Sequence, residues 1–121
     1  MASHTEPLVI IFEQSEWDLS SRDDLKRLLE PARTHPNVIL DMSLVTFADS
    51  TALQALINLR QERAAANFEP ARIVAHNPQI RRLFKMLGLD SVWSLYMSLE
   101  DALTDMQLSR EAGDTNANSS A

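Results

Sequence analysis

The chain has 121 residues, 45% of them hydrophobic and 23% charged, which is the composition of one ordinary globular domain. A formal net charge of −6 at pH 7 argues against a nucleic-acid backbone or an anionic membrane surface as partner. Because cysteine is absent, disulfides, thiolate metal sites and a cysteine nucleophile are excluded.

The N-terminal part carries one apolar run and one segment with helical spacing. Residues 8–12, LVIIF, predict a short strand that is buried on both faces. After a polar loop, residues 20–32 predict an amphipathic helix that Ser20 or Ser21 caps and whose first turn is acidic. Its inner stripe consists of Leu25, Leu28, Leu29 and Ala32.

A second strand and a second helix follow. Residues 37–42, NVILDM, predict another buried strand. The next apolar positions have helical spacing, and we expect this helix to start near Ser50 and to carry Arg60, Glu62 and Arg63 on its outer face. The apolar positions are Leu53, Leu56, Ile57 and Ala64.

Two more strands and two more helices complete the pattern. Residues 71–76, ARIVAH, predict a third strand. Residues 77–88 predict a helix that Asn77 caps, with proline in its first position and glycine at its end. Residues 91–96 predict a fourth strand, and residues 98–108 predict a last helix that begins with a capping serine.

The alternation of strands and helices predicts an α/β fold. We expect a single domain over residues 1–108, with a mostly parallel central sheet of four to five strands and four or five helices. Residues 109–121 are small and polar, and we expect them to form a disordered C-terminal tail. The start of the chain lacks the basic and apolar regions of a signal peptide, and no apolar run approaches a membrane span, so we expect a cytoplasmic protein.

The sequence lacks the motifs of the common nucleotide and metal enzymes. Glycine-rich phosphate loops are missing, and His4, His35 and His76 have no partner at the spacing of a metal site. Ser50 with Asp49 and His76 could form a nucleophile group, but a nucleophile elbow and a recognisable oxyanion hole are missing. We therefore expect no enzymatic activity, no cofactor and no metal.

Asp49, Ser50 and Thr51 form a polar triplet just before the second predicted helix. Any of the three side chains can cap the helix by accepting hydrogen bonds from its free N–H groups. Thr51 and Gln54 also have the spacing of a capping box. On the residues alone, helix capping and modification of a hydroxyl both stay open.

The two tryptophans stand in different contexts. Trp93 belongs to the fourth predicted strand, where a place in the core is the simplest interpretation. Trp17 lies in a polar loop between Glu16 and Asp18. For Trp17, core packing and contact with a protein partner both stay open.

Three stretches of the sequence resemble one known family. VILDMSLVTFADSTAL, residues 38–53, is similar to the signature of STAS domains, in particular of bacterial anti-sigma factor antagonists, in which Asp-Ser-Ser-Gly-Leu opens a helix after a strand. Residues 15–29 resemble the family's Gly-Glu-Leu-Asp stretch and the helix after it, with Asp18 at the Asp. Residues 77–103 resemble its C-terminal part, so that the likeness covers roughly residues 8–105.

The resemblance implies a phosphorylation switch that regulates transcription in the bacterial stress response. It implies Ser50 as the phosphorylated residue, with Thr51 as second choice, and Asp18, Asp49, Ser50 and Thr51 as contacts to the partner. Trp17 is a further candidate contact on the basis of its loop position alone. The implied partners are an anti-sigma factor with kinase activity and a serine/threonine phosphatase. The unphosphorylated protein would bind the anti-sigma factor and free the sigma factor, and phosphorylation would release the complex.

The chain departs from the family pattern at three places. Ala52 replaces the family's glycine after the serine pair, and Ser15 replaces the glycine before Glu-Leu-Asp. Residues 1–7 leave little sequence for the family's additional N-terminal strand, so they form at most a shortened one. A sheet edge left uncovered would allow a homodimer to form by strand pairing.

The same resemblance is also compatible with other functions of a STAS domain. The protein could be a STAS subunit that is never phosphorylated and acts as a scaffold in a larger assembly, such as a lipid-transport complex or a stress-signalling particle. The polar triplet would then only cap a helix and contact the partner. A STAS domain of an anion transporter is less expected, because the sequence contains no membrane segment.

Overall fold

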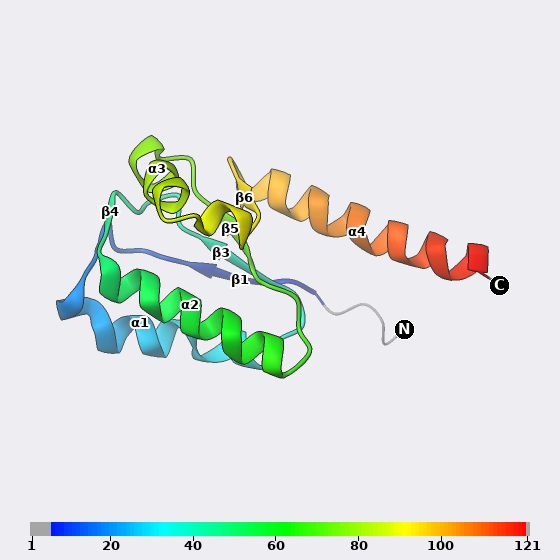
Figure 1. Ribbon diagram of the computed structural model, residues 1–121, viewed down its shortest axis with the longest axis horizontal. Coiled ribbons are helices and arrows are strands. Elements are labelled where there is room, and N and C mark those ends of the chain that lie inside the picture. Colours follow the sequence, from blue (N-terminus) through cyan, green and yellow to red (C-terminus); the bar gives the residue numbers. More distant parts are fainter. Residues whose placement is uncertain (1–5, 121) are drawn as a thin grey trace.

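The computed structural model describes the backbone of residues 6–120 and the side chains of residues 6–109. Its centre is a parallel sheet of four strands in the order β1-β3-β5-β6 (Figure 1). The strands are β1 (Leu8–Ile11), β3 (Val38–Asp41), β5 (Arg72–Val74) and β6 (Leu95–Tyr96). This mixed architecture confirms the predicted α/β fold with a parallel central sheet.

Helices cover both faces of the sheet. The four α-helices are α1 (Arg22–Leu29), α2 (Ser50–Ala65), α3 (Pro78–Met86) and α4 (Leu99–Ser120). Successive side chains of a strand point to opposite faces. In β3, Val38 and Leu40 accordingly join the large core formed with α1, α2 and α3, whereas Ile39 packs in a smaller cluster with Ala102 and Met106 of α4. Figure 1 shows α1 and α2 together on one side of the sheet, with α4 on the other.

Five short elements join these main ones. β2 (Glu16–Trp17) and β4 (Phe47–Ala48) pair in parallel as a separate two-stranded sheet. Three 3-10 helices are η1 (Leu19–Ser21), η2 (Glu30–Arg33) and η3 (Leu89–Ser91). Neither β2 nor β4 was predicted from the sequence, because a strand of two residues shows no periodicity. Both strands matter for the site, since they lead into Asp18 and Asp49.

The four α-helices start where the sequence predicts them, and only the capping of α1 differs. α2 begins at Ser50, as predicted. Asn77 caps α3 with its side chain, and the Ser98 hydroxyl accepts a hydrogen bond from the Asp101 N–H at the start of α4. α1 begins at Arg22 with Ser21 in the cap position, as predicted, but the Ser21 side chain makes no capping hydrogen bond, and Asp18 caps the preceding η1.

The strands and the tail differ from the expectation in extent. β1 is an edge strand rather than a strand buried on both faces, and its Ile11 is 46% exposed. β6 covers only the last two residues of the predicted segment, although Trp93 before it is buried against Phe84 as expected. The backbone of α4 continues to Ser120, while the side chains from residue 110 lie outside the described residues, so the tail stays a prediction.

Arg63 corrects the predicted outer face of α2. Its side chain is 1% exposed and donates to the carbonyl oxygens of Ala32, His35, Pro36 and Glu69 at distances from 2.5 to 3.2 Å. Ala64, which the apolar pattern placed inside, is exposed. At its C-terminal end, α2 therefore turns the side of Arg63 toward the protein interior, and not the side of Ala64 as predicted.

No helix within the described residues is both long enough and apolar enough to cross a bilayer.

Candidate functional site

The short sheet β2–β4 brings the segments of Asp18 and Asp49 together. Trp17 is paired with Ala48 in parallel register, so Asp18 and Asp49 are the next residues of two adjacent strands. The Asp49 N–H donates to the Trp17 carbonyl at 3.1 Å, and Asp49 Oδ2 accepts from the Leu19 N–H at 3.2 Å. The two segments that the sequence analysis connected only by resemblance thus lie side by side.

Asp49 is the cap of α2. Its Oδ1 accepts hydrogen bonds from the N–H groups of Thr51 at 2.9 Å and Ala52 at 3.1 Å. The alternative capping box of Thr51 and Gln54 is wrong, because Gln54 donates along the helix to Asn58 instead. Two of the N–H groups at this helix start are therefore satisfied by a carboxylate of the protein itself.

Ser50 is the first residue of α2 and is exposed. Among the described residues, its hydroxyl group has no hydrogen-bond partner. Thr51 is partly buried, and it likewise makes no side-chain hydrogen bond within that part of the chain. Of the two hydroxyls, that of Ser50 is the more accessible to a modifying enzyme.

Asp18 is engaged in its own turn. Its Oδ1 accepts from the Ser20 N–H at 2.9 Å and from the Ser20 hydroxyl at 2.5 Å, with a longer contact from the Ser21 hydroxyl at 3.5 Å. These hydrogen bonds, above all that from the Ser20 hydroxyl, lower the pKa of Asp18 below its ordinary value of 3.8. Asp18 therefore stays charged at neutral pH beside the start of α2.

Asp41 serves a similar local purpose at the end of β3. Its Oδ1 accepts from the Ser43 N–H at 3.0 Å and from the Ser43 hydroxyl at 2.5 Å, which closes the turn after the strand. Within residues 6–109, no hydrogen bond or ion pair connects Asp41 with Asp49 or Ser50. The structure thus places Asp18 beside Asp49 through the contacts of its neighbours Trp17 and Leu19, whereas Asp41 has no such connection within the described residues.

Trp17 is a core residue, which corrects the expectation that it offers an exposed anchor. Its side chain is only 3% exposed, and its Nε1–H donates to the Gln14 carbonyl at 2.8 Å. Its ring packs edge-on against Phe12 with centroids 5.2 Å apart. A partner can therefore not use Trp17 as a protruding contact, although the residue supports the loop that carries Asp18.

Three exposed apolar side chains near this site escaped the sequence analysis. Leu19 is 63% exposed directly after Asp18, and Leu44 and Phe47, at 57% and 49%, lie in the connection that leads to Asp49. The only feature of the sequence that could have indicated their exposure is that each is an apolar residue outside the predicted strands and helices. These three side chains, which we call the apolar rim, offer the kind of contact that a protein partner can bury.

A groove of about 630 Å³ lies between α1 and α2 next to Ser50. Basic residues of α1 and η2 line one wall, and polar residues of α2 line the other. Its lining includes Arg22, Lys26, Arg33, Ser50, Thr51, Gln54, Asn58 and Glu62. No periodicity argument could have found it, because a groove depends on how two helices pack.

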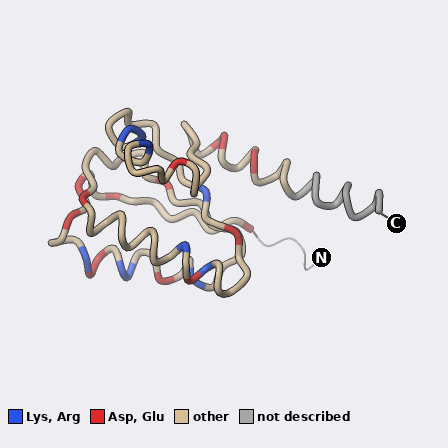
Figure 2. The backbone as a smooth tube through the Cα atoms, viewed as in Figure 1, with Lys and Arg blue, Asp and Glu red and all other residues tan. Residues whose placement is uncertain are grey.

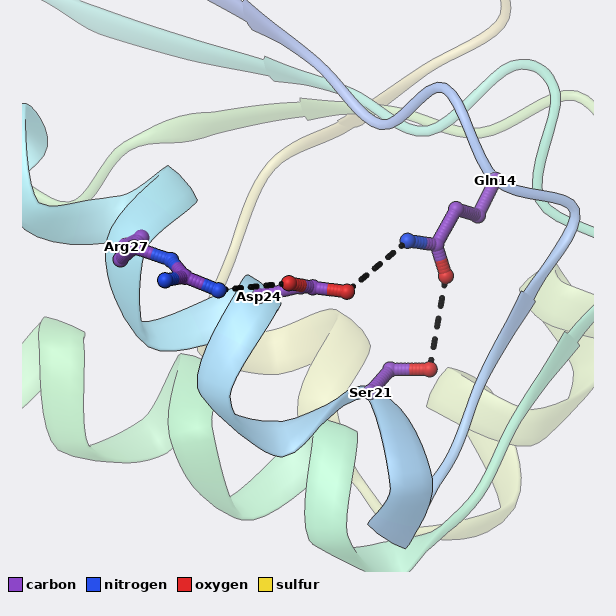
Figure 3. A network of polar contacts seen from close by, with 4 residues as sticks. All are labelled: Gln14, Ser21, Asp24 and Arg27. Carbon is purple, nitrogen blue, oxygen red and sulfur yellow. Dashed lines mark hydrogen bonds and ion pairs between the residues drawn. The ribbon is translucent and has the colours of Figure 1, made fainter.

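α1 is fixed in place by a chain of polar contacts. Ser21 donates to the side chain of Gln14, Gln14 donates to Asp24, and Asp24 forms an ion pair with Arg27 at 2.9 Å (Figure 3). Along α1 basic and acidic residues alternate, whereas α3 carries only basic ones (Figure 2). The polar contacts hold the first turns of α1 against the segment before β2 and so define one wall of the groove.

The other candidate residues do not assemble into a catalytic or metal site. His76 lies in a second hollow between α3 and β6, and no described contact joins it to Ser50 or Asp49. His35 accepts from the Asn37 N–H through Nδ1, and His4 lies outside the described residues. A search of the described residues finds no group of histidine, aspartate and glutamate side chains arranged to hold a metal ion.

Comparison with known proteins gives a family and a set of similar folds. The family model described as STAS domain matches residues 1–102. No curated protein matches the sequence. The fold is similar to that of an anti-sigma factor antagonist from Mycobacterium paratuberculosis, with a TM-score of 0.66 and 26% identity over 87% of this chain and 89% of that one.

Two further solved structures show the same fold at lower identity. One is a sulfate transporter family protein from Wolinella succinogenes, with a TM-score of 0.73 and 16% identity over 87% of this chain and 88% of that one. The other is the Bacillus cell fate determinant SpoIIAA in the phosphorylated form, with a TM-score of 0.63 and 18% identity over 86% of this chain and 94% of that one.

Proposed function

Because this chain belongs to the STAS domain family, we propose that it is an anti-sigma factor antagonist whose partner binding is switched by a phosphate on Ser50. The unphosphorylated protein binds an anti-sigma factor that is also its kinase, and a sigma factor is freed for transcription. Phosphorylation ends this binding, and a serine/threonine phosphatase restores it. The protein acts in the cytoplasm as a binding partner and catalyses no reaction itself.

The observation that carries this proposal is the exposed, unbonded hydroxyl of Ser50. Asp49 caps the start of α2 through Oδ1 and accepts from the Leu19 N–H through Oδ2, so Ser50 is held at a defined position without being needed for capping. The solved anti-sigma factor antagonist at 26% identity adds support from a protein of the same fold.

The substitution of alanine for the family's glycine at position 52 is compatible with this proposal. Ala52 is 4% exposed, and its methyl group packs within the large core. The additional methyl group therefore points into the protein and does not stand between Ser50 and an approaching kinase.

The apolar rim provides a docking surface for the anti-sigma factor. Leu19 lines the groove together with Ser50, Leu44 and Phe47 lie in the connection that leads to Asp49, and burial of these exposed side chains would contribute favourable free energy to the complex. A phosphate adds about −1.5 to −2 charges at neutral pH. When the partner docks, the phosphate charge beside the buried apolar side chains would lose its hydrating water. The free-energy cost of this desolvation weakens the complex.

The experiment that tests the switch is phosphorylation by the cognate kinase, followed by mass spectrometry. We expect phosphate on Ser50, no phosphate on the Ser50→Ala variant, and normal modification of Thr51→Ala. The unmodified Ser50→Ala variant should still bind the anti-sigma factor. Phosphate on Thr51 alone, or on neither residue, would contradict the assignment.

The competing function is a STAS scaffold that is never phosphorylated. It is favoured by the fact that Asp49 alone accounts for the helix cap, so the polar triplet has a structural explanation without any modification. The phosphorylation state of the protein isolated from its own cells separates the two functions. Mass spectrometry should find a fraction with phosphate on Ser50 in a switch, whereas in a scaffold Ser50 should be unmodified under all growth conditions.

A further inference from the structure

The groove between α1 and α2 contains two cations without a carboxylate partner among the described residues. Arg22 and Lys26 are exposed on α1 and line the groove together with Ser50. Their neighbours Arg27 and Arg33 differ, because each forms an ion pair with an acidic side chain. The groove thus offers uncompensated positive charge on the wall opposite α2.

The two helices run in the same direction, which places Arg22 and Ser50 at the same end of the groove. At this end Leu19, just before α1, donates to Asp49, just before α2. An ion pair of 3.2 Å joins the opposite ends of the two segments. Arg22 therefore lies level with Ser50, and Lys26 lies one helical turn further along the same wall.

The helix start itself offers little to a phosphate group. A free helix N-terminus binds anions through its unpaired N–H groups. Here the N–H groups of Thr51 and Ala52 already donate to the Asp49 carboxylate. A phosphate on Ser50 must therefore find its counter-charges elsewhere, and the side chains that line the groove are the available ones.

We propose that a phosphate on Ser50 pairs in cis with Arg22 and Lys26 and closes this end of the α1–α2 groove. The inference rests on the proposed function, because it concerns the phosphorylated form. In the modification, the kinase transfers the γ-phosphoryl group of a nucleoside triphosphate to Ser50 Oγ. The new O–P bond forms, the bond to the nucleoside diphosphate breaks, and the hydroxyl proton is released. Arginine and lysine both form charge-assisted hydrogen bonds with phosphate oxygens.

The proposal gives the phosphate a second effect besides added charge. It ties α1 to the start of α2 and fills the groove beside the apolar rim, so that a partner segment can no longer enter there. Among the charged side chains that line the groove, Arg22 and Lys26 from α1 favour the dianion of the phosphate, whereas Arg33 and Glu62 are paired with each other at the far end. Asp49, next to Ser50 in the sequence, and Asp18, at the end of the adjacent strand, oppose the dianion. Removal of the two cations should therefore raise the second pKa of the phosphate.

The test uses the full chain with phosphoserine installed at position 50 during translation, so that no kinase is needed. The second pKa of the phosphate is measured by phosphorus NMR titration in this protein and in the variant Arg22→Gln/Lys26→Gln. Unperturbed phosphoserine titrates at about pH 6. We expect the pKa in the double variant to lie about one unit above that in the parent, because two neighbouring positive charges are lost.

Arg27→Gln is the matched control. Arg27 is exposed on the same helix but points to Asp24 and does not line the groove (Figure 3). This variant should leave the phosphate pKa unchanged, and unfolding in urea should abolish the difference between parent and double variant. Equal pKa values in the folded parent and the folded double variant would overturn the proposal. Failure of the proposed function is distinguishable, since it would appear as absence of kinase modification and would not change this titration.

Discussion

At the scale of single residues, two aspartates with similar sequence contexts have different tasks. Asp49 uses both carboxylate oxygens, one for the first N–H groups of α2 and one for the Leu19 N–H. Asp18 directs its Oδ1 to Ser20 and Ser21 and so orders the turn that leads to α1. Asp49 thus joins two segments, whereas Asp18 stabilises one.

This difference predicts how Asp18 contributes to partner binding. If Asp18 acts through its charge, both Asp18→Asn and Asp18→Ala weaken binding to the anti-sigma factor. If it acts by ordering the turn, Asp18→Asn retains an oxygen acceptor and binding stays near the parent, whereas Asp18→Ala loses the cap. We expect the second pattern, with a loss of about tenfold for Asp18→Ala, which corresponds to about 1.4 kcal/mol.

Calorimetric titration of the two Asp18 variants against the anti-sigma factor measures the effect. Circular dichroism of the free variants shows whether the fold is kept. Equal weakening by both variants would show that the partner reads the charge directly.

At the scale of secondary-structure elements, Arg63 connects α2 to two other segments. Its guanidinium donates to carbonyl groups at the end of η2, in the turn after it, and in the loop before β5. Desolvation by burial lowers the pKa of the Arg63 guanidinium, yet the group stays charged at neutral pH. The side chain thus replaces the backbone donors that these carbonyl groups would otherwise need.

Replacement of Arg63 should destabilise the fold more than any surface arginine would. Arg63→Met keeps much of the apolar stem but leaves several buried carbonyl groups without a donor, and each such group costs about 1–3 kcal/mol. We expect a loss of about 3 kcal/mol in the free energy of unfolding, measured by urea titration. The exposed Arg82 offers a control, because Arg82→Met should change stability by less than about 0.5 kcal/mol. Similar effects of the two substitutions would contradict the assigned role.

α4 is held to the sheet by a small apolar cluster and one polar network. Asp105 Oδ2 accepts from the Tyr96 hydroxyl at 2.5 Å and from Arg72 Nε at 3.0 Å. The hydrogen bond from Tyr96, followed by that from Arg72, lowers the pKa of Asp105 below its ordinary value of 3.8. The folded state thus favours the charged form of Asp105 more than the unfolded state does.

The contribution of Asp105 to stability should depend on pH. A carboxyl group with a lowered pKa stabilises the folded state above the unfolded pKa of about 3.8 and loses this effect as the pH falls through the folded value. Asp105→Asn should therefore be less stable than the parent at pH 7, and the difference should shrink below about pH 4. Urea midpoints of both proteins at several pH values measure this. A difference that stays constant down to pH 2 would mean that charge plays no part.

The prediction of the elements from sequence succeeded where a repeating pattern existed. The buried strand at β3 and the helix starts at Ser50 and Asn77 follow from apolar runs and from residues that can accept from free N–H groups. β2 and β4 are too short for any period to be visible. Arg63 was misplaced because residue type favours the surface, and only the packed structure shows that carbonyl groups surround it.

At the scale of the whole molecule, the candidate site and the β1 edge of the central sheet are formed by different elements. The strand pair β2–β4 and the start of α2 carry Ser50 and the apolar rim, whereas β1 forms the edge of the described central sheet.

Two features of the candidate site could not be predicted from the sequence. One is the residue of the polar triplet that caps α2, since aspartate, serine and threonine can all cap a helix. The other is the exposure of the three apolar side chains of the apolar rim, because this exposure depends on how the two short strands meet.

This separation predicts that substitutions in the apolar rim weaken binding to the anti-sigma factor selectively. Phe47→Ser removes an aromatic side chain that is 49% exposed in the free protein and that a docked partner would bury. Full burial of an aromatic side chain contributes about 1.5–3 kcal/mol, and about half of the Phe47 side chain remains to be buried, so we expect binding to weaken by about four- to twelvefold in a fluorescence titration. Met86→Ser is the control, because Met86 is 74% exposed at the end of α3 and lies outside the apolar rim. Its affinity should equal that of the parent. If Met86→Ser weakened the complex as much as Phe47→Ser, or if Phe47→Ser bound normally, the partner would dock on a different surface.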